Sequence, residues 1–162
     1  MKDELTIKQR EDAFSLNPEG MVELLQIDLA TGQTTLRFSK NQELEYLGAT
    51  WESVPFNLAE AGVNTQGEAS RPKLSVVNPD GAFSAWIAQG AADSALVTRY
   101  RILQSDLEAG IAAYQKRVWR ISKPLSLSKS LVVFELRSPL DGQAFVLPGR
   151  AFYPPEFSHV SL

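Results

Sequence analysis

The chain has 162 residues, of which 44% are hydrophobic and 22% charged, and its formal net charge is −3. This composition is typical of one globular domain that buries roughly two-thirds of its unfolded surface. Because there is no cysteine, the sequence excludes disulfides, thiolate zinc sites, iron–sulfur ligation by this chain and thiol catalysis. The acidic balance also argues against a general affinity for nucleic acids.

Charge is spread unevenly along the chain. Residues 1–69 carry 5 basic and 12 acidic side chains, whereas residues 70–162 carry 11 basic and 7 acidic ones. The difference can reflect no more than solvated surfaces. Alternatively, identical copies could meet acidic side to basic side, as in a ring built from head-to-tail contacts.

The N-terminal segment is charged and mostly polar, without the apolar core of a secretory signal. Its pattern predicts a modest helix over residues 3–16, with a thin apolar stripe that cannot stabilise an isolated helix. The apolar residues are Leu5, Ile7, Phe14 and Leu16. Either a frayed terminus or docking on a neighbouring subunit fits this pattern. No apolar run approaches the roughly 20 residues that cross a bilayer, so we expect a cytosolic protein unless an assembly carries it out.

The next part of the chain consists of short strands and turns. Alternating apolar residues predict a β-hairpin over 21–29 and 34–40, with its turn between them. Two short strands hinged at Gly48 are expected within residues 44–56. The polar, small-residue segment 57–70 predicts a loop, of a length that is more often functional or interface-forming than idle.

A strand over residues 71–78 leads into the clearest helix signal of the chain, residues 78–90. Asn78 is expected as the N-cap and Pro79 at the first helical position, and Gly90 ends the helix. The residues expected on its buried face are Phe83, Trp86 and Ile87.

The C-terminal half alternates again. Residues 94–107 predict a strand with one face in water, followed by a short turn or helical segment. Residues 117–139 predict further strands, in which Val132, Phe134 and Leu136 share one face. About six to nine strands and one to three short helices, joined by hairpin-type connections, favour a mainly β (α+β) fold, an antiparallel sandwich or barrel.

Catalytic chemistry has little support in the sequence. The single histidine, His159, lies near the C-terminus, so a Ser-His-Asp triad is not expected. Glycine-rich nucleotide loops, His-Glu-x-x-His and calcium-loop patterns do not occur. Carboxylates that are close in sequence are typical of solvated surface. They are Glu11 with Asp12, Glu43 with Glu45, and Asp106 with Glu108.

Arginines and tryptophans are the remaining candidates for binding. A basic stripe could comprise Arg99, Arg101, Arg117, Arg120 and Lys123. Because exposed aromatics do not interleave with it, a protein interface is favoured over nucleic acid. The three tryptophans are expected to fill the core rather than stack on sugars or bases. They are Trp51, Trp86 and Trp119.

Several short phrases follow one another in a recognisable order. They are Arg71-Pro72-Lys73-Leu74-Ser75-Val76-Val77-Asn78 with Gly81, then Val97-Thr98-Arg99, then Phe134-Glu135-Leu136 with Ser138-Pro139-Leu140-Asp141, then Leu147-Pro148-Gly149-Arg150. In this order, over about residues 20–150, the chain resembles the minor tail protein L family of long-tailed phages.

The resemblance implies a non-enzymatic subunit of the tail tip or baseplate hub, with a fold related to that of the tail tube. It implies a homotrimeric ring, alternatively a homohexameric one, between the distal tail protein and the central tip protein in the virion. Genomic DNA would meet the ring only while passing through the channel, and no stable membrane association is expected.

The lambda-like members continue, after the Pro-Gly-Arg phrase, into a cysteine-rich domain that holds an iron–sulfur cluster. Here no cysteine can receive a ligand role, so we expect no cluster and no other cofactor. The expected organisation is an N-terminal arm over residues 1–17, a hub domain over 18–150 and a C-terminal arm over 151–162. We expect contacts between subunits in the two arms and in loop 57–70.

The candidate interface residues are Arg71, Arg99, Arg101, Trp51, Phe152, Tyr153 and Phe157. Two other functions remain open. One is a host-surface carbohydrate-binding β-sandwich module of the tail that uses exposed aromatics such as Trp51 and Tyr46. The other is an enzyme that assists penetration, a peptidase or muramidase, whose candidate carboxylates are Glu43, Glu45, Asp106 and Glu108.

Overall fold

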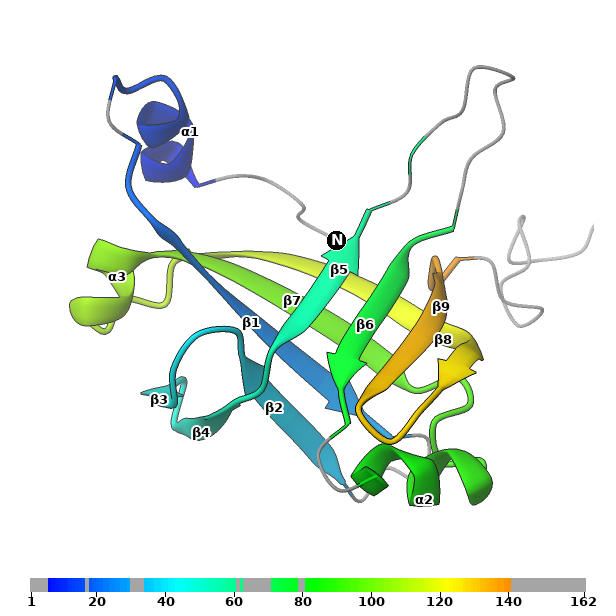
Figure 1. The fold of residues 1–162 in the computed structure, drawn as a ribbon. Coiled ribbons are helices and arrows are strands. Elements are labelled where there is room, and N and C mark those ends of the chain that lie inside the picture. Colours follow the sequence, from blue (N-terminus) through cyan, green and yellow to red (C-terminus); the bar gives the residue numbers. More distant parts are fainter. Residues whose placement is uncertain are drawn as a thin grey trace, which may run out of the picture.

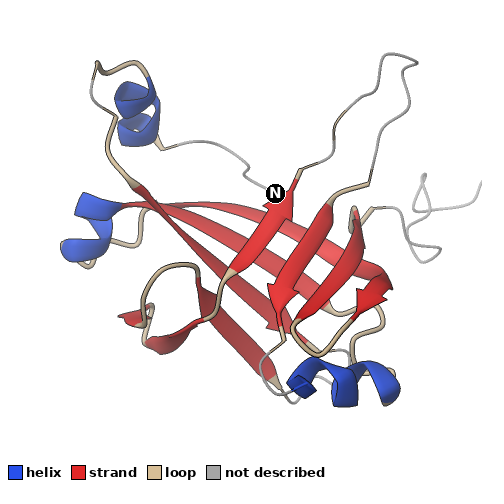
Figure 2. Cartoon of the chain, viewed as in Figure 1, coloured by secondary structure: helices blue, strands red, loops and turns tan. Residues whose placement is uncertain are grey.

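The computed structural model describes residues 6–16, 18–29, 34–60, 62, 71–78 and 81–140. In this part of the chain, nine strands and three short helices form a mainly β fold, as the sequence predicts (Figures 1 and 2). The strands are β1 (Met21–Asp28), β2 (Thr35–Ser39), β3 (Leu44–Tyr46), β4 (Ala49–Ser53), β5 (Phe56–Ala59), β6 (Lys73–Val77), β7 (Leu96–Leu103), β8 (Tyr114–Leu127) and β9 (Leu131–Arg137). The helices are α1 (Ile7–Ala13), α2 (Ala82–Ala88) and α3 (Gln104–Glu108).

These strands belong to one sheet, in the order β3-β4-β2-β1-β7-β8-β9-β6-β5. Neighbours are antiparallel except β2 and β4, which run parallel, so the expected antiparallel sheet is mixed. The sheet folds over on itself: β5, β6 and β9 form a front layer that crosses β1, β2, β7 and β8 behind it (Figure 1). The long strand β8 pairs with both layers, and its two register shifts are the kind of irregularity that bends a strand.

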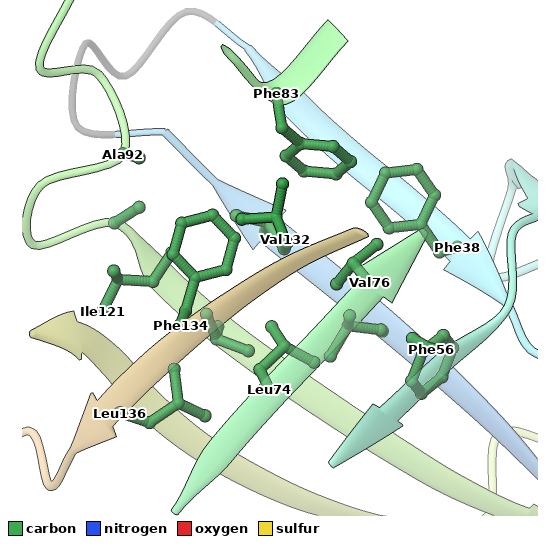
Figure 3. Close-up of a cluster of buried hydrophobic side chains, with 14 of the residues drawn as sticks. Phe38, Phe56, Leu74, Val76, Phe83, Ala92, Ile121, Val132, Phe134 and Leu136 are labelled. Carbon is green, nitrogen blue, oxygen red and sulfur yellow. The ribbon is translucent and has the colours of Figure 1, made fainter. Parts of the chain in front are cut away.

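The main hydrophobic core fills the space between the two layers (Figure 3). Leu25 and Ile27 of β1 belong to the same cluster as Leu74 and Val76 of β6 and Phe134 of β9, and all five are almost completely buried. Apolar burial at about 25 cal/mol per Å² is the largest force holding the layers together.

Helix α2 covers one end of this core. Its Phe83 ring lies 5.9 Å from Phe38, 5.2 Å from Trp86 and 6.4 Å from Phe134, measured between ring centroids. Trp86 and Ile87 pack against the same cluster. The predicted apolar face of this helix is therefore confirmed.

The start of α2 differs from the prediction over residues 78–90. Asn78 does accept a hydrogen bond from the backbone N–H of Phe83 (3.0 Å). The residue that precedes the helix is Gly81, however, whose left-handed φ of 73° interrupts helical geometry. Pro79, expected at the first helical position, lies outside the described residues.

A second hydrophobic cluster lies on the other face of β1 and β7, beneath β3, β4 and α3. Trp51 of β4 packs edge to face with Tyr100 of β7, at 5.7 Å between ring centroids, and its indole N–H donates to the Tyr46 carbonyl (3.0 Å). Both faces of β7 are therefore covered. The expectation that the strand within residues 94–107 has one face in water is wrong, because short elements distant in sequence cover that face.

Two predicted bounds also change. Helix α1 begins after its N-cap Thr6 and ends at Ala13, whereas the sequence predicts a helix as far as residue 16; residues 3–5 of the expected helix lie outside the described residues. The first residues of the expected loop 57–70 belong to strand β5, whose Phe56 and Leu58 enter the main core. The expected turn between residues 29 and 34 lies largely outside the described residues.

Candidate interaction surfaces

A cluster of charged side chains lies around Arg99 and Arg101 of β7, away from the end of the core that α2 covers. Arg99 of β7 is only 3% exposed, and its guanidinium pairs with Glu60, which follows β5 in the front layer. Arg117 of β8 is the register partner of Arg99 and binds the same carboxylate, with Nη1 2.8 Å from Oε2 of Glu60. Glu60 thus joins the front layer to two strands of the back layer.

The two guanidinium groups change the titration of Glu60. The hydrogen bond from Arg99, supported by the charges of Arg99 and Arg117, lowers the pKa of this carboxyl below its ordinary value of 4.5, against the effect of partial desolvation. A pKa lowered by folding means that the interaction stabilises the fold fully above pH 4.5 and is lost as the pH falls through the lowered value. The link between the layers is therefore intact at neutral pH.

Glu23 of β1 extends the charged cluster. Its Oε1 accepts a hydrogen bond from Nε of Arg101 (3.0 Å) and lies 4.0 Å from Nη1 of Arg99, and its Oε2 lies 3.3 Å from Nζ of Lys40. The guanidinium carbon of Arg99 also lies 5.5 Å from the centroid of the Trp119 ring. The Arg99 guanidinium is buried, so removing its carboxylate partners would leave its charge uncompensated. These ion pairs therefore connect β1, β7 and β8 with the segment that follows β5.

These contacts correct the interface role expected for Arg99, because its charge is buried and bound by its own chain. Arg101 is partly exposed but is held by Glu23. Arg71 is exposed, and its Nη1 lies 2.7 Å from Oε1 of Glu135 in β9. This hydrogen bond lowers the pKa of Glu135 below 4.5. Of the three arginines, only Arg71 combines a contact between elements with a mainly exposed side chain.

The aromatic candidates divide between buried residues and residues that are not described. Trp51 is 1% exposed and Tyr46 is also buried, so the core role expected of Trp51 is confirmed and its use as an exposed binding or interface residue is wrong. The remaining candidates lie outside the described residues. They are Phe152, Tyr153 and Phe157, with the single histidine, His159.

The carboxylate pairs do not converge on a site. Asp106 is buried and its Oδ1 lies 2.6 Å from Nζ of Lys8, whereas Glu108, two residues on, is exposed. Glu43 and Glu45 are exposed at β3. Among the described residues there is no group of three or more histidine or acidic side chains placed to hold a metal ion. No helix in that part of the chain has the length and apolar character to cross a membrane.

Helix α1 packs its polar side against the domain. Thr6 and Gln9 form a capping box, in which the Gln9 N–H donates to Thr6 Oγ1 (3.2 Å) and the Thr6 N–H donates to Gln9 Oε1 (3.1 Å). The same Gln9 amide donates through Nε2 to the Arg101 carbonyl in β7 (3.1 Å), and Gln9 is completely buried. Lys8 adds its ion pair with Asp106 of α3.

The apolar residues of the N-terminal segment point outward instead. We call the following set the N-terminal end face: Ile7, Phe14 and Leu16 with Leu47 of the β3–β4 turn and Ile111 after α3, all exposed. The Tyr46 hydroxyl donates to the Ile111 carbonyl (3.0 Å) and thereby ties β3 to this end of the molecule. The predicted alternatives were fraying or docking on a neighbour. Helix α1 is not frayed, because it docks on its own domain through these polar contacts. Ile7 of the helix, its C-cap residue Phe14 and Leu16 beyond it are exposed, so docking on a neighbour stays a prediction.

A second exposed apolar group lies at the other end of β8. Strands β8 and β9 meet there in a hairpin that carries Leu125, Leu127 and Leu131 on its surface, and we call these three residues the hairpin end face. The sequence analysis names the N-terminal arm as a contact segment, but it does not predict that Leu47 and Ile111 belong to the same face, nor that the hairpin end face exists. Leu127 is the register partner of the buried Val132, and partners in register share a face, so alternation alone does not indicate that Leu127 is exposed.

Comparison with known proteins leaves the family open. No protein-family model and no curated protein sequence matches the chain. The function of the chain is therefore inferred from its residues and from their arrangement.

Proposed function

We propose that this chain is a structural subunit of a bacteriophage tail tip or baseplate hub. In this proposal it forms a ring, a homotrimer or alternatively a homohexamer, around the tail channel between the distal tail protein and the central tip protein. Its task is to bind its neighbours and to form part of the wall of the channel through which the genome passes on ejection. The proposal includes no catalytic step and no cofactor.

The observation that carries the proposal is that phrases resembling the tail protein L family meet in space. Strand β6, from the Arg71-to-Asn78 phrase, pairs with β9, from the phrase that begins at Phe134. Arg71 and Glu135, one from each phrase, form an ion pair. Residues 64 positions apart that belong to these phrases thus contact one another, as they would if the phrases were parts of one conserved structural unit.

The polar residues of these phrases also have structural tasks. Asn78 donates through Nδ2 to the Ser128 carbonyl (2.8 Å) and so joins the end of β6 to the β8–β9 hairpin. Arg99, from the Val97-Thr98-Arg99 phrase, holds Glu60 across the layers. The resemblance therefore includes residues that determine the architecture, which supports a common fold more strongly than matching apolar positions would.

The test is the presence of the protein in purified tails. Quantitative mass spectrometry of tails should find the chain at a fixed ratio to the tail-tube protein, and an image reconstruction of the tip should place it in a ring with threefold or sixfold symmetry. A protein confined to the lysate of infected cells and absent from virions would refute the proposal.

The carbohydrate-binding alternative loses the aromatics on which it depended, because Trp51 and Tyr46 are buried. Trp51→Ala should destabilise the domain by about 3–5 kcal/mol, the usual result of removing a large buried aromatic side chain. Chemical denaturation measures this loss. A Trp51→Ala variant that keeps wild-type stability but loses glycan-array binding would restore the alternative.

A further inference from the structure

The two end faces lie at opposite ends of the molecule. Strand β8 starts at Tyr114, three residues after Ile111 of the N-terminal end face, and ends at Leu127 of the hairpin end face. At roughly 3.3 Å per residue, a strand of 14 residues spans at most about 43 Å between its ends. Figure 1 shows the same separation, with α1, α3 and β3 at one side and the β8–β9 turn beside α2 at the other.

The elements around the two faces carry opposite charge. The segments 6–16, 43–47 and 104–113, which surround the N-terminal end face, hold six carboxylates against Lys8 and Arg10, a formal balance of −4. The paired hairpin segment 120–137 holds four cations against Glu135, a formal balance of +3. The cations are Arg120, Lys123, Lys129 and Arg137.

Each face also combines apolar side chains with a polar surround. An exposed apolar group rimmed by charge is the usual composition of a protein contact surface, and charge of opposite sign selects the partner face. Like faces would bring carboxylate to carboxylate or cation to cation, which is unfavourable. Charge complementarity therefore favours the contact of one face with the other over the contact of a face with its own kind.

We propose that the N-terminal end face of one copy binds the hairpin end face of the next copy. The contact is heterologous, because two different surfaces meet, and its repetition closes into a ring when the rotation between copies closes. Phe14 and Leu16 are the apolar anchors on one side, and Leu125 and Leu127 on the other. This inference rests on the proposed ring assembly and names the surfaces that build it.

The polar docking of α1 has a specific purpose in this contact. A helix of seven residues is not stable alone. Without contacts to the rest of the domain, α1 could not hold exposed apolar side chains in a fixed position. The buried Gln9 amide and the Lys8–Asp106 ion pair fix the helix without using its apolar residues. Of the exposed apolar residues Ile7 lies in the helix, Phe14 is its C-cap and Leu16 follows it, so fixing α1 also fixes the position in which this end is presented to a neighbour.

The chain has no cysteine, so introduced thiols can report the contact without background. The experiment uses the full chain with Phe14→Cys, Leu127→Cys or both, treated with a flexible bismaleimide and run on a denaturing gel. Heterologous contact predicts a ladder of covalent multimers from the double variant. Each single variant alone should remain monomeric, and an equal mixture of the two should give dimers only.

The other outcomes overturn the proposal. Dimers from Phe14→Cys alone, or from Leu127→Cys alone, would show that like faces meet. Absence of cross-links from the double variant at all protein concentrations would show that these faces do not join copies. The control replaces Phe14→Cys by Lys73→Cys, at an exposed residue of β6 outside both faces, together with Leu127→Cys; it should give no ladder.

A second measurement tests the charge argument. Lys129→Glu should weaken self-association of the full chain by about two- to fivefold, the range of an exposed ion pair, and raised salt should reduce the difference. Tighter association of this variant would contradict the proposed polarity. Presence of the protein in virions is measured separately. If the two faces do not join copies, the proposed tail function still stands. If the protein is absent from tails, the proposed function is refuted whatever the cross-links show.

Discussion

Helices α1 and α2 are the same length, seven residues each, but they are packed in opposite ways. Helix α2 places Phe83 in the core and packs Trp86 and Ile87 against it. Helix α1 buries Gln9 and leaves Ile7 and Phe14 in solvent. Helix α2 completes the domain, whereas α1 is attached to it by hydrogen bonds and an ion pair. Apolar residues in a short helix therefore do not by themselves tell whether the helix covers its own core or offers a surface to another molecule.

The largest effect should come from removing the apolar anchor of α2. Phe83→Ala is expected to cost about 3–5 kcal/mol of global stability, because the ring contacts aromatic side chains of both layers and leaves a cavity. Chemical denaturation with a wild-type control measures the change. A loss below about 1 kcal/mol would place α2 in the same class as α1, as a helix attached from outside.

Removing the polar anchor of α1 should have a smaller and local effect. Gln9→Ala deletes the bonds to Thr6 and to the Arg101 carbonyl and should cost about 1–3 kcal/mol. Native-state hydrogen exchange should show faster opening of α1 with unchanged protection in β7 and β8. Arg10→Ala, at the exposed neighbouring position, is the matched control. A global loss of protection in Gln9→Ala would contradict the distinction between the two helices.

Between neutral and alkaline pH, the ion pair of α1 should depend on the titration of Lys8. Its hydrogen bond to Asp106 raises the pKa of Lys8 above the ordinary 10.5. A pKa raised by folding stabilises fully below pH 10.5 and is lost as the pH rises through the raised value. The difference in melting temperature between wild type and Lys8→Met should thus be constant up to about pH 10 and shrink above it. A difference that vanishes already at pH 8 would contradict the assignment.

The smallest effect on stability should come from the apolar stripe of α1. Phe14 is 92% exposed, so Phe14→Ala should change the stability of the dilute monomer by no more than about 0.5 kcal/mol. Denaturation at low protein concentration measures this. A loss above about 1 kcal/mol would mean that Phe14 packs within its own chain and would remove the contrast with Phe83.

Local signals were sufficient for much of the architecture. The alternation of apolar residues located most strands, and Gly48, at a positive φ of 69°, does separate β3 from β4. The polar, small-residue composition of segment 57–70 predicts a loop from its first residue, although Phe56 and Leu58 alternate as a strand requires and belong to β5.

The pairing of strands that are distant in the chain could not be predicted from local sequence patterns. Neither propensity nor spacing indicates that β6 pairs with β9, or that β3 and β4 cover the second face of β7. For the same reason the sequence pattern favours an interface role for Arg99. Its burial depends on Glu60, which lies 39 positions away in a segment expected to be a loop. Burial of a charge depends on such a partner, and local patterns do not report it.

The two edges of the sheet are very short, with three residues in β3 and four in β5. Backbone groups on a free strand edge invite strand addition by another chain, which is the usual route to fibres. Edges of this length offer few such groups. The sheet therefore gives little template for amyloid-like aggregation, and any association between copies would depend on side chains rather than on free strand edges.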